Sequence, residues 1–215
     1  MQQKILVLKL EGIVYNKKTN EPIGNAHVTL NRIDGSTFRL ETDNDGKFKF
    51  NLEENSDYNL IGDKINYLSD RTSLTTKNLT TSTTIKRGLF LDSIVLNKAI
   101  KLENIYYDFD KADIRPDAAV ELDKLVKVLE DNPTIWIELS SHTDSRGNDQ
   151  YNQRLSQSRA NSAVQYIIYR GINKNRITAK GYGESQLIND CANGIKCSEA
   201  EHQLNRRTEF EITKQ

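Results

Sequence analysis

The chain has 215 residues, which is enough for one or two domains that each bury a hydrophobic core. Its 30 basic and 30 acidic residues cancel, so the charge balance does not favour general binding to nucleic acid or to an anionic membrane. A mean hydropathy of -0.66 and the lack of a long apolar run exclude a transmembrane helix.

The N-terminus does not match an export signal. The apolar run that begins at Ile5 is interrupted by Lys9, whereas the hydrophobic region of a signal peptide needs roughly 7–15 residues. We therefore interpret Lys4 to Leu10 as a strand or as the end of an upstream linker.

The first half of the chain has the pattern of short strands and turns, without a helix. Asp43-Asn44-Asp45-Gly46 precedes Phe48 and Phe50 and predicts a hairpin, because an Asp-Gly pair tolerates the positive φ of tight turns. This acidic turn lacks the alternating ligands of an EF-hand, so we expect no calcium there. The spacing of the strands predicts a small β-sandwich. The expected strands are 7–15, 23–30, 38–41, the segment around Phe48 and Phe50, 58–60 and 85–96.

Two pieces of this half, EGIVYNKKTNEPIGNAHVTL and TDNDGKFKF, resemble the carboxypeptidase regulatory-like domain. The resemblance covers about Lys9 to Leu96, although the polar segment 66–87 has no clear match. It implies a transthyretin-like β-sandwich and does not imply peptidase activity.

A rhythm of strands and helices begins after a short linker expected at Lys98–Glu103, so we expect domains at 1–97 and 104–215. Pro116 suits the first turn of a helix that ends before Pro133. A second helix ends at Gly171. The order β-α-β-α-β-β predicts two helices on one face of a mixed sheet, and an α+β fold for the whole chain. The expected strands run from Ile105 into 108–110, and over 135–139, 176–180 and 208–213.

The polar turn Ser140–Gly147 lies between the central strand and the second helix. Asp144 in this turn and Arg159 in the helix could hold opposite charges of one small molecule, because loops at strand ends commonly bind ligands. Asn152 and Leu155 precede Arg159 at three- and four-residue spacings, so the three share one helix face. The residues alone leave two structural alternatives open: Asp144 as a helix N-cap and Arg159 as a surface cation.

The string HTD-S-R-G-x(4)-N-x-R-L-S-x-x-R-A, completed by Asn205-Arg206-Arg207, resembles the OmpA C-terminal family of peptidoglycan-binding domains. The resemblance covers about Ile100 to Lys214 and implies the same β-α-β-α-β-β fold. Members of this family bind the diaminopimelate of a peptidoglycan stem peptide, whose end carries an ammonium and a carboxylate on one carbon.

The resemblance assigns roles to individual residues. Asp144 would receive the ammonium, and Arg159 would hold the carboxylate through two hydrogen bonds, a geometry that lysine does not offer. His142 is expected to orient its neighbours through hydrogen bonds. Tyr182 is expected to pack in the core, and the alternative is that it forms a wall of the site. The remaining positions expected around the ligand are Thr143, Asn152, Leu155, Asp108, Phe109, Asp110 and Arg206.

Cys191 and Cys197 are the two cysteines of the chain, with five residues between them. Two unpaired thiols remain possible, and a metal pair is disfavoured because no second Cys or His pair lies at ligand spacing. We favour a disulfide, which implies an oxidising compartment such as the periplasm. Because no export signal is recognisable, we expect the chain to be the C-terminal part of a longer exported protein.

The expected function is non-catalytic binding of peptidoglycan, which would anchor an outer-membrane-associated assembly to the cell wall without a cofactor or metal. The pairing of the two domains resembles the C-terminal half of larger Bacteroidetes envelope proteins, some of which serve type IX secretion. A wall hydrolase is disfavoured, because His27, His142 and His202 are scattered and form no metal triad. The alternative is a protein-interaction module in which the β-sandwich docks a partner.

Overall fold

The computed structural model describes residues 6–103, 105 and 112–215. The chain divides into two compact units, residues 1–94 and 95–215, which are described separately. The sequence pattern placed the end of the first domain at residue 97, close to this division.

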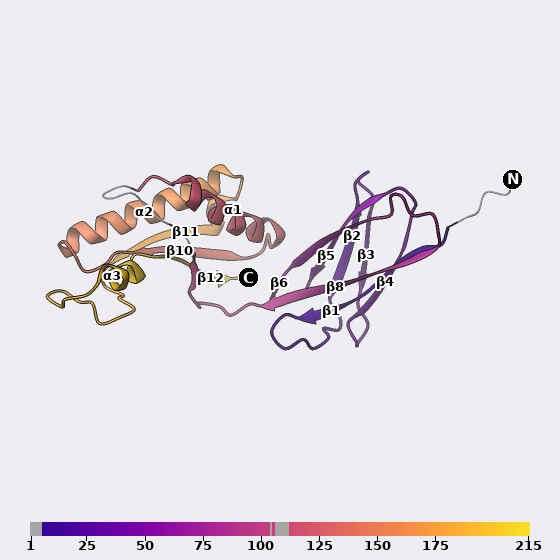
Figure 1. Cartoon of the computed structure of the whole chain (residues 1–215), viewed down its shortest axis with the longest axis horizontal. Helices are drawn as coiled ribbons and strands as arrows, with labels where there is room; N and C mark the ends of the chain where they lie inside the picture. The colour runs from indigo at the N-terminus through magenta and orange to yellow at the C-terminus, as the bar shows by residue number, and fades with distance from the viewer. Residues whose placement is uncertain (1–5, 104, 106–111) are drawn as a thin grey trace. The chain divides into compact units, whose positions relative to one another are not determined.

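Among the described residues, eight strands form the first unit (Figure 1). They make two four-stranded sheets, with the orders β4-β1-β8-β6 and β3-β2-β5-β7. The strands are β1 (Leu8–Asn16), β2 (His27–Arg32), β3 (Thr37–Glu41), β4 (Lys47–Leu52), β5 (Asp57–Asp63), β6 (Tyr67–Leu68), β7 (Asp70–Thr75) and β8 (Thr83–Ser93).

Both sheets of the first unit contribute to one hydrophobic core. Strand β4 alternates strictly, with Phe48, Phe50 and Leu52 buried between exposed neighbours, as expected for a sheet with one face against a core. Leu10 from β1 and Leu60 from β5, which lie in different sheets, are both fully buried in this core. Two sheets around a shared core are the arrangement of a β-sandwich. The closer resemblance to a carboxypeptidase regulatory-like domain stays a prediction.

The hairpin predicted at Asp43–Gly46 is wrong. A tight turn does form, because the Gly46 N–H donates to the Asp43 carbonyl (3.0 Å) and Gly46 has φ +72°. However, β3 and β4 belong to different sheets, so the turn connects the two layers. On one side Thr42 bonds to Ala26, and on the other the Val14 N–H donates to Gly46. Long-range pairing with β2 and β1 therefore decides the path of both flanks.

The second unit is a mixed sheet of order β11-β10-β12-β9, and Figure 1 shows α1 and α2 along one side of it. Strands β10 and β11 are parallel, whereas β12 is antiparallel to both β10 and β9. The elements are β9 (Ile100–Leu102), α1 (Pro116–Asp131), β10 (Trp136–His142), α2 (Asp149–Tyr169), a 3-10 helix (Lys174–Arg176), β11 (Ile177–Gly183), α3 (Glu199–Asn205) and β12 (Thr208–Lys214).

Two features of this unit differ from the sequence expectation. Ile100–Leu102, expected to lie in a linker, form β9 because Ile100 and Leu102 pair with Phe210 and Thr208 of β12. Helix α3 was not predicted, since its seven residues, mostly polar, carry little apolar periodicity. The strand expected at 105–110 lies mostly outside the described residues.

Local signals set the ends of the two long helices. Pro116 begins α1, which ends before Pro133 as predicted. The Asn148 side chain caps α2 by accepting a hydrogen bond from the Tyr151 N–H (2.8 Å), so Asn148 has the N-cap role that remained open for Asp144. Gly171, with φ +101°, follows the end of α2. In the part of the chain that the structure describes, no helix is long and apolar enough to span a membrane.

Candidate functional site

The site lies where β10 ends and leads into α2. Two backbone hydrogen bonds fix this strand end: the His142 N–H donates to the Arg207 carbonyl (2.9 Å), and the Thr143 N–H to the Gly183 carbonyl (2.9 Å). Asp144 follows directly and is only 5% exposed. Neighbouring strands therefore hold the Asp144 backbone on both sides, which gives its carboxylate a defined position.

The carboxylate of Asp144 is already engaged by two arginines. One oxygen accepts from the backbone N–H of Arg146 (3.0 Å), and the other accepts from the Arg146 guanidinium (2.8 Å) and is also paired with Arg206 Nη1. Burial raises the pKa of Asp144, but the hydrogen bonds from Arg146 and Arg206 outweigh burial and keep that pKa below its usual value. The group is therefore an anion at neutral pH, and its Oδ2 is engaged by both guanidinium groups.

Glu199, the first residue of α3, completes a cluster of four charges. Arg146 Nη1 lies 2.8 Å from one Glu199 oxygen, and Arg206 Nη2 lies 2.5 Å from the other. Hydrogen bonds from both arginines lower the pKa of Glu199. We call Asp144, Arg146, Glu199 and Arg206 the four-charge cluster. Neither Arg146 nor Glu199 was predicted as a site residue: Glu199 lies on the unpredicted helix α3, and the partners of Arg146 become apparent only in the folded chain.

Arg159 is 7% exposed and reaches a small cavity of about 60 Å³ from α2. Arg206 lines the same cavity, whereas Asp144 is not among the residues that line it. Arg206 therefore lies at the cavity that Arg159 reaches and is also paired with Asp144. Among the residues that the structure describes, the cavity is lined by Ile105, Ser141, His142, Arg159, Gln203, Arg206, Arg207 and Thr208.

The other predicted site residues differ in burial, in hydrogen bonding and in whether they line the cavity. Asn152 is buried, and its side-chain amide donates to the carbonyls of Asp144 (3.3 Å) and Arg146 (3.2 Å), so it supports the turn. Thr143 is also buried, and its hydroxyl has no hydrogen-bond partner among the described residues. Leu155 is half-buried and does not line the cavity.

Asp108, Phe109 and Asp110 lie outside the described residues. Ile105 is buried and lines the cavity, so the chain enters the site shortly before them.

His142 is packed within the sheet end. Its ring stacks on Tyr182, with 5.2 Å between ring centroids, and its Nε2 lies 3.5 Å from a Glu209 oxygen. The nearby His142 and then Arg207, whose Nε donates to Glu209 (2.7 Å), hold the pKa of Glu209 at about 2 although burial raises it. These contacts fit the orienting role expected of His142. Tyr182 donates to Glu138 (3.0 Å) and does not line the cavity.

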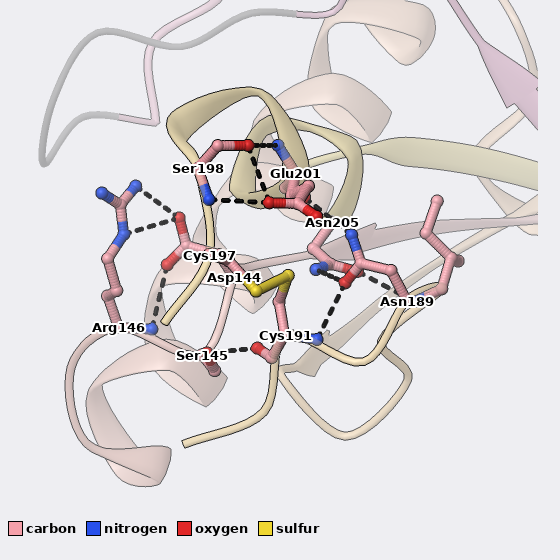
Figure 2. Close-up of a disulfide and its surroundings, with 10 residues drawn as sticks. Asp144, Ser145, Arg146, Asn189, Cys191, Cys197, Ser198, Glu201 and Asn205 are labelled. Carbon is pink, nitrogen blue, oxygen red and sulfur yellow. Dashed lines mark hydrogen bonds and ion pairs between the residues drawn. A yellow bond between two sulfur atoms is a disulfide. The ribbon is translucent and has the colours of Figure 1, made fainter. Parts of the chain in front are cut away.

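Cys191 and Cys197 are joined by a disulfide, which Figure 2 shows beside the site. The Ser145 hydroxyl donates to the Cys191 carbonyl (2.6 Å), which ties the loop to the residue after Asp144. Cys197 directly precedes Ser198, the N-cap of α3, whose hydroxyl and backbone both bond to Glu201. The bridge therefore connects the Asp144 turn to the start of α3, which carries Glu199. Because its sulfurs are bonded to each other, they offer no thiolate for a metal.

Comparison with known proteins locates the similarity in this second unit. Residues 106–200 match the OmpA family. Over 112 residues the chain is 38% identical to outer membrane porin F of Pseudomonas fluorescens. The aligned segment covers 52% of this chain and 33% of that protein. The chain is 42% identical over 86 residues to the photosystem I P700 chlorophyll a apoprotein A2 of Gloeobacter violaceus, covering 40% of this chain and 10% of that protein.

Among solved structures, the peptidoglycan-associated lipoprotein from Burkholderia pseudomallei matches with 24% identity and a TM-score of 0.45, over 50% of this chain and 87% of that one. The chain spans a third or less of the length of the two curated relatives named above. The similarity to these proteins concerns a segment and not the whole chain. Residues 106–200 form an OmpA-family domain.

Proposed function

We propose that the second unit binds peptidoglycan without catalysis, through the ammonium and carboxylate of a diaminopimelate stem peptide. The observation that carries the proposal is the pair of buried opposite charges, Asp144 and Arg159, at one end of the sheet. Arg206 connects them, because it lines the cavity of Arg159 and is paired with Asp144. The OmpA-family match over 106–200 and the ordered HTD…NRR motif support the same assignment.

The chemistry follows from the two side chains. The Arg159 guanidinium would hold the ligand carboxylate through two parallel hydrogen bonds, and Asp144 would accept from the ammonium. Hydrogen bonds to charged groups contribute roughly 1.5–3 kcal/mol each, so a few of them give micromolar to millimolar affinity. Peptidoglycan repeats its stem peptides, so a tethered copy rebinds at high effective concentration. His142 is engaged with Tyr182 and Glu209, a structural use that does not require catalysis.

The cellular role that we propose is to anchor an outer-membrane-associated assembly to the cell wall from the periplasm. The disulfide supports an oxidising compartment, since such bridges persist mainly outside the cytosol. A type IX secretion apparatus is the specific assembly suggested by the sequence resemblance, and it belongs to this proposal.

Co-sedimentation with insoluble peptidoglycan tests the proposal. We expect the wild type to pellet with diaminopimelate-type peptidoglycan and not with the lysine type, which lacks the second carboxylate. Arg159→Lys keeps the charge but loses the two-pronged geometry, so its apparent affinity should fall by about ten-fold or more. Arg154→Lys, at an exposed position of the same helix, is the matched control. Equal pelleting of Arg159→Lys and wild type would contradict the assignment.

A hollow on the β-sandwich favours a second candidate function, the docking of a partner protein. It has a volume of about 650 Å³ and lies on the sheet formed by β4, β1 and β8. Its floor includes Ile13, which pairs with Lys47 and Gly88 on the neighbouring strands. At one end the Tyr15 and Phe90 rings stack with 5.5 Å between centroids. Phe90 is 44% exposed, so part of its ring faces solvent next to Tyr15 of the hollow.

The charges around this hollow favour an acidic partner segment that carries an aromatic or aliphatic side chain. Its lining contains four cations, Lys47, Lys49, Lys86 and Arg87, but only two anions, Glu11 and Asp43. We would titrate the whole chain with the peptide Glu-Glu-Phe-Glu-Glu and follow amide chemical shifts. Shifts confined to the hollow and lost in Lys86→Glu, but kept in Lys127→Glu on α1, would support docking; no shifts would count against it.

A further inference from the structure

We propose that Arg206 is an internal occupant of the ligand site. In the unliganded protein its guanidinium occupies Asp144 Oδ2, and the ammonium group of the ligand displaces it. This inference rests on the proposed function, because it describes how the same site admits its ligand. It differs from the sequence expectation, in which Arg206 is a direct ligand contact.

The position of Arg206 between the cavity and Asp144 is the first argument. Arg206 and Arg159 both line the cavity, and Asp144 does not. The contact of Arg206 with Asp144 Oδ2 therefore lies between the ligand's carboxylate site and its ammonium site. In this arrangement an ammonium group that approaches Asp144 Oδ2 from the cavity meets Arg206 first.

Arg206 is also the arginine that can leave more readily. Arg146 contacts Asp144 through its backbone N–H (3.0 Å), its Nε (3.2 Å) and its Nη2 (2.8 Å). Arg206 contacts Asp144 through Nη1 alone, and its Nη2 lies 2.5 Å from Glu199. Its Nε donates to Gln203 (3.2 Å). If Arg206 releases Asp144, Glu199 still neutralises its charge, so the guanidinium is not left without a partner.

The residue that would receive Arg206 is held in place. Glu199 begins α3 directly after the N-cap Ser198, where a capping box joins Ser198 to Glu201 (Figure 2). The disulfide fixes Cys197 to Cys191, and Cys191 accepts from Ser145 next to Asp144. The two carboxylates of the four-charge cluster therefore belong to one cross-linked frame. Within that frame, movement of the Arg206 side chain alone would make Asp144 Oδ2 accessible to the ligand.

This arrangement selects for a zwitterion. A ligand with only a carboxylate can bind Arg159 but gives no compensation for breaking the Arg206–Asp144 pair. A ligand with an ammonium beside its carboxylate replaces the guanidinium with another cation and so keeps Asp144 neutralised. Arg206 thus favours zwitterionic ligands, because only they compensate the free energy needed to break the Arg206–Asp144 pair.

The sign of a mutational effect tests the proposal. We would titrate the whole chain with a diaminopimelate-containing tripeptide by calorimetry, and compare wild type with Arg206→Gln and Glu199→Gln. If the closed form makes up about 90% of the unliganded protein, Arg206→Gln should tighten binding by about ten-fold. Glu199→Gln should weaken binding, because Arg206 loses its second carboxylate and stays on Asp144. Thermal unfolding checks that both variants fold.

A second ligand separates this mechanism from the proposed function. The tripeptide with its diaminopimelate amine acetylated should bind weakly, with the same affinity to wild type and Glu199→Gln, because it never displaces Arg206. Weaker binding of the unmodified tripeptide by folded Arg206→Gln would overturn the internal-occupant role and leave the proposed function standing, provided that Arg159→Ala abolishes wild-type binding. Absence of binding to both wild type and Arg206→Gln would overturn both proposals.

Discussion

Buried charges in the second unit occur in sets and not as isolated pairs. Asp144 is bonded to Arg146 and Arg206, and Glu209 is bonded to Arg207 and lies beside His142. Removing a charge from water costs several kcal/mol unless partners replace the lost solvation. In each set the buried carboxylate, Asp144 or Glu209, has more than one cationic or hydrogen-bonding neighbour, so loss of one neighbour removes only part of its compensation.

The pH dependence of stability should report on Glu209. Its pKa in the folded chain is about 2, below the usual 4.5, chiefly because His142 lies beside the carboxylate and Arg207 bonds to it. The unfolded chain thus takes up this proton more readily, so the stabilisation is complete above the unfolded pKa and is lost as pH falls toward the folded one. Between about pH 5 and pH 2 we expect a loss of up to about 3 kcal/mol in the free energy of unfolding from this group.

Urea unfolding of wild type and Glu209→Gln at a series of pH values checks this expectation. The difference in unfolding free energy between the two proteins should be large near neutral pH and should shrink toward pH 2. A difference that stays constant over the whole range would show that the Glu209 ionisation does not contribute.

At the residue scale, the sequence could name positions but not their partners. The ordered motif pointed to Asp144 and Arg159, because both residue type and spacing match a family pattern. The structure places both residues at one sheet end, although their contact with diaminopimelate stays a prediction. The sequence alone could not reveal the four-charge cluster, since Arg146 and Glu199 are 53 positions apart and meet only through tertiary packing.

At the scale of elements, α2 packs unusually close to β11 at Gly181. A Cβ at this position would lie 2.5 Å from the Cα of Gln157, closer than real contacts allow. Gln157 accepts from the Gly181 N–H (2.9 Å), and Gln153 donates to the Gly181 carbonyl (2.7 Å). Helix side chains therefore cover the outer edge of the sheet, which would otherwise present unpaired backbone groups.

Replacement of Gly181 by alanine tests this packing. We expect Gly181→Ala to lower the free energy of unfolding by about 2–3 kcal/mol or more, because backbone of the helix must shift to admit the methyl group. Thr178→Ala, at an exposed position of the same strand, should change it by less than about 0.5 kcal/mol. Chemical denaturation measures both, and equal stability of Gly181→Ala and wild type would refute the close packing.

Elements with strong local signals were predicted, and those that depend on distant pairing were not. Helix α1 was recognised from its apolar stripe and from prolines near both ends. Strands β6 and β7 lie in a polar segment without alternation, and the turn at Asp43–Gly46 was assigned to a hairpin. Strand β6 pairs with the more distant β8, and β7 pairs with the nearby β5, but neither segment carries an alternating pattern that would reveal its partner.

At the scale of the whole chain, each unit has its own buried core. The first unit buries residues from both of its sheets, and the second buries the apolar faces of α1, α2 and β10. The alternation of strands and helices predicted for the second half agrees with this organisation, and the fold is α+β. For the second unit the OmpA resemblance implied the fold, since period and composition alone do not fix a strand order.

We expect residues 1–94 and 95–215 to fold when they are produced separately. Each piece should show a cooperative thermal transition, and only 95–215 should pellet with peptidoglycan. Circular dichroism and co-sedimentation measure the two properties. Failure of 95–215 to fold alone would show that the division between the units is not an energetic boundary.

The central claim is that Asp144 and Arg159 grip the two opposite charges of one ligand. Calorimetric titration of the whole chain with a diaminopimelate-containing tripeptide tests it most directly, with Asp144→Ala and Arg159→Ala as variants. We predict saturable binding by the wild type in the micromolar to millimolar range, and loss of binding in both variants while they remain folded. A wild type that does not bind, or a folded Asp144→Ala variant that binds as tightly as the wild type, would contradict the claim.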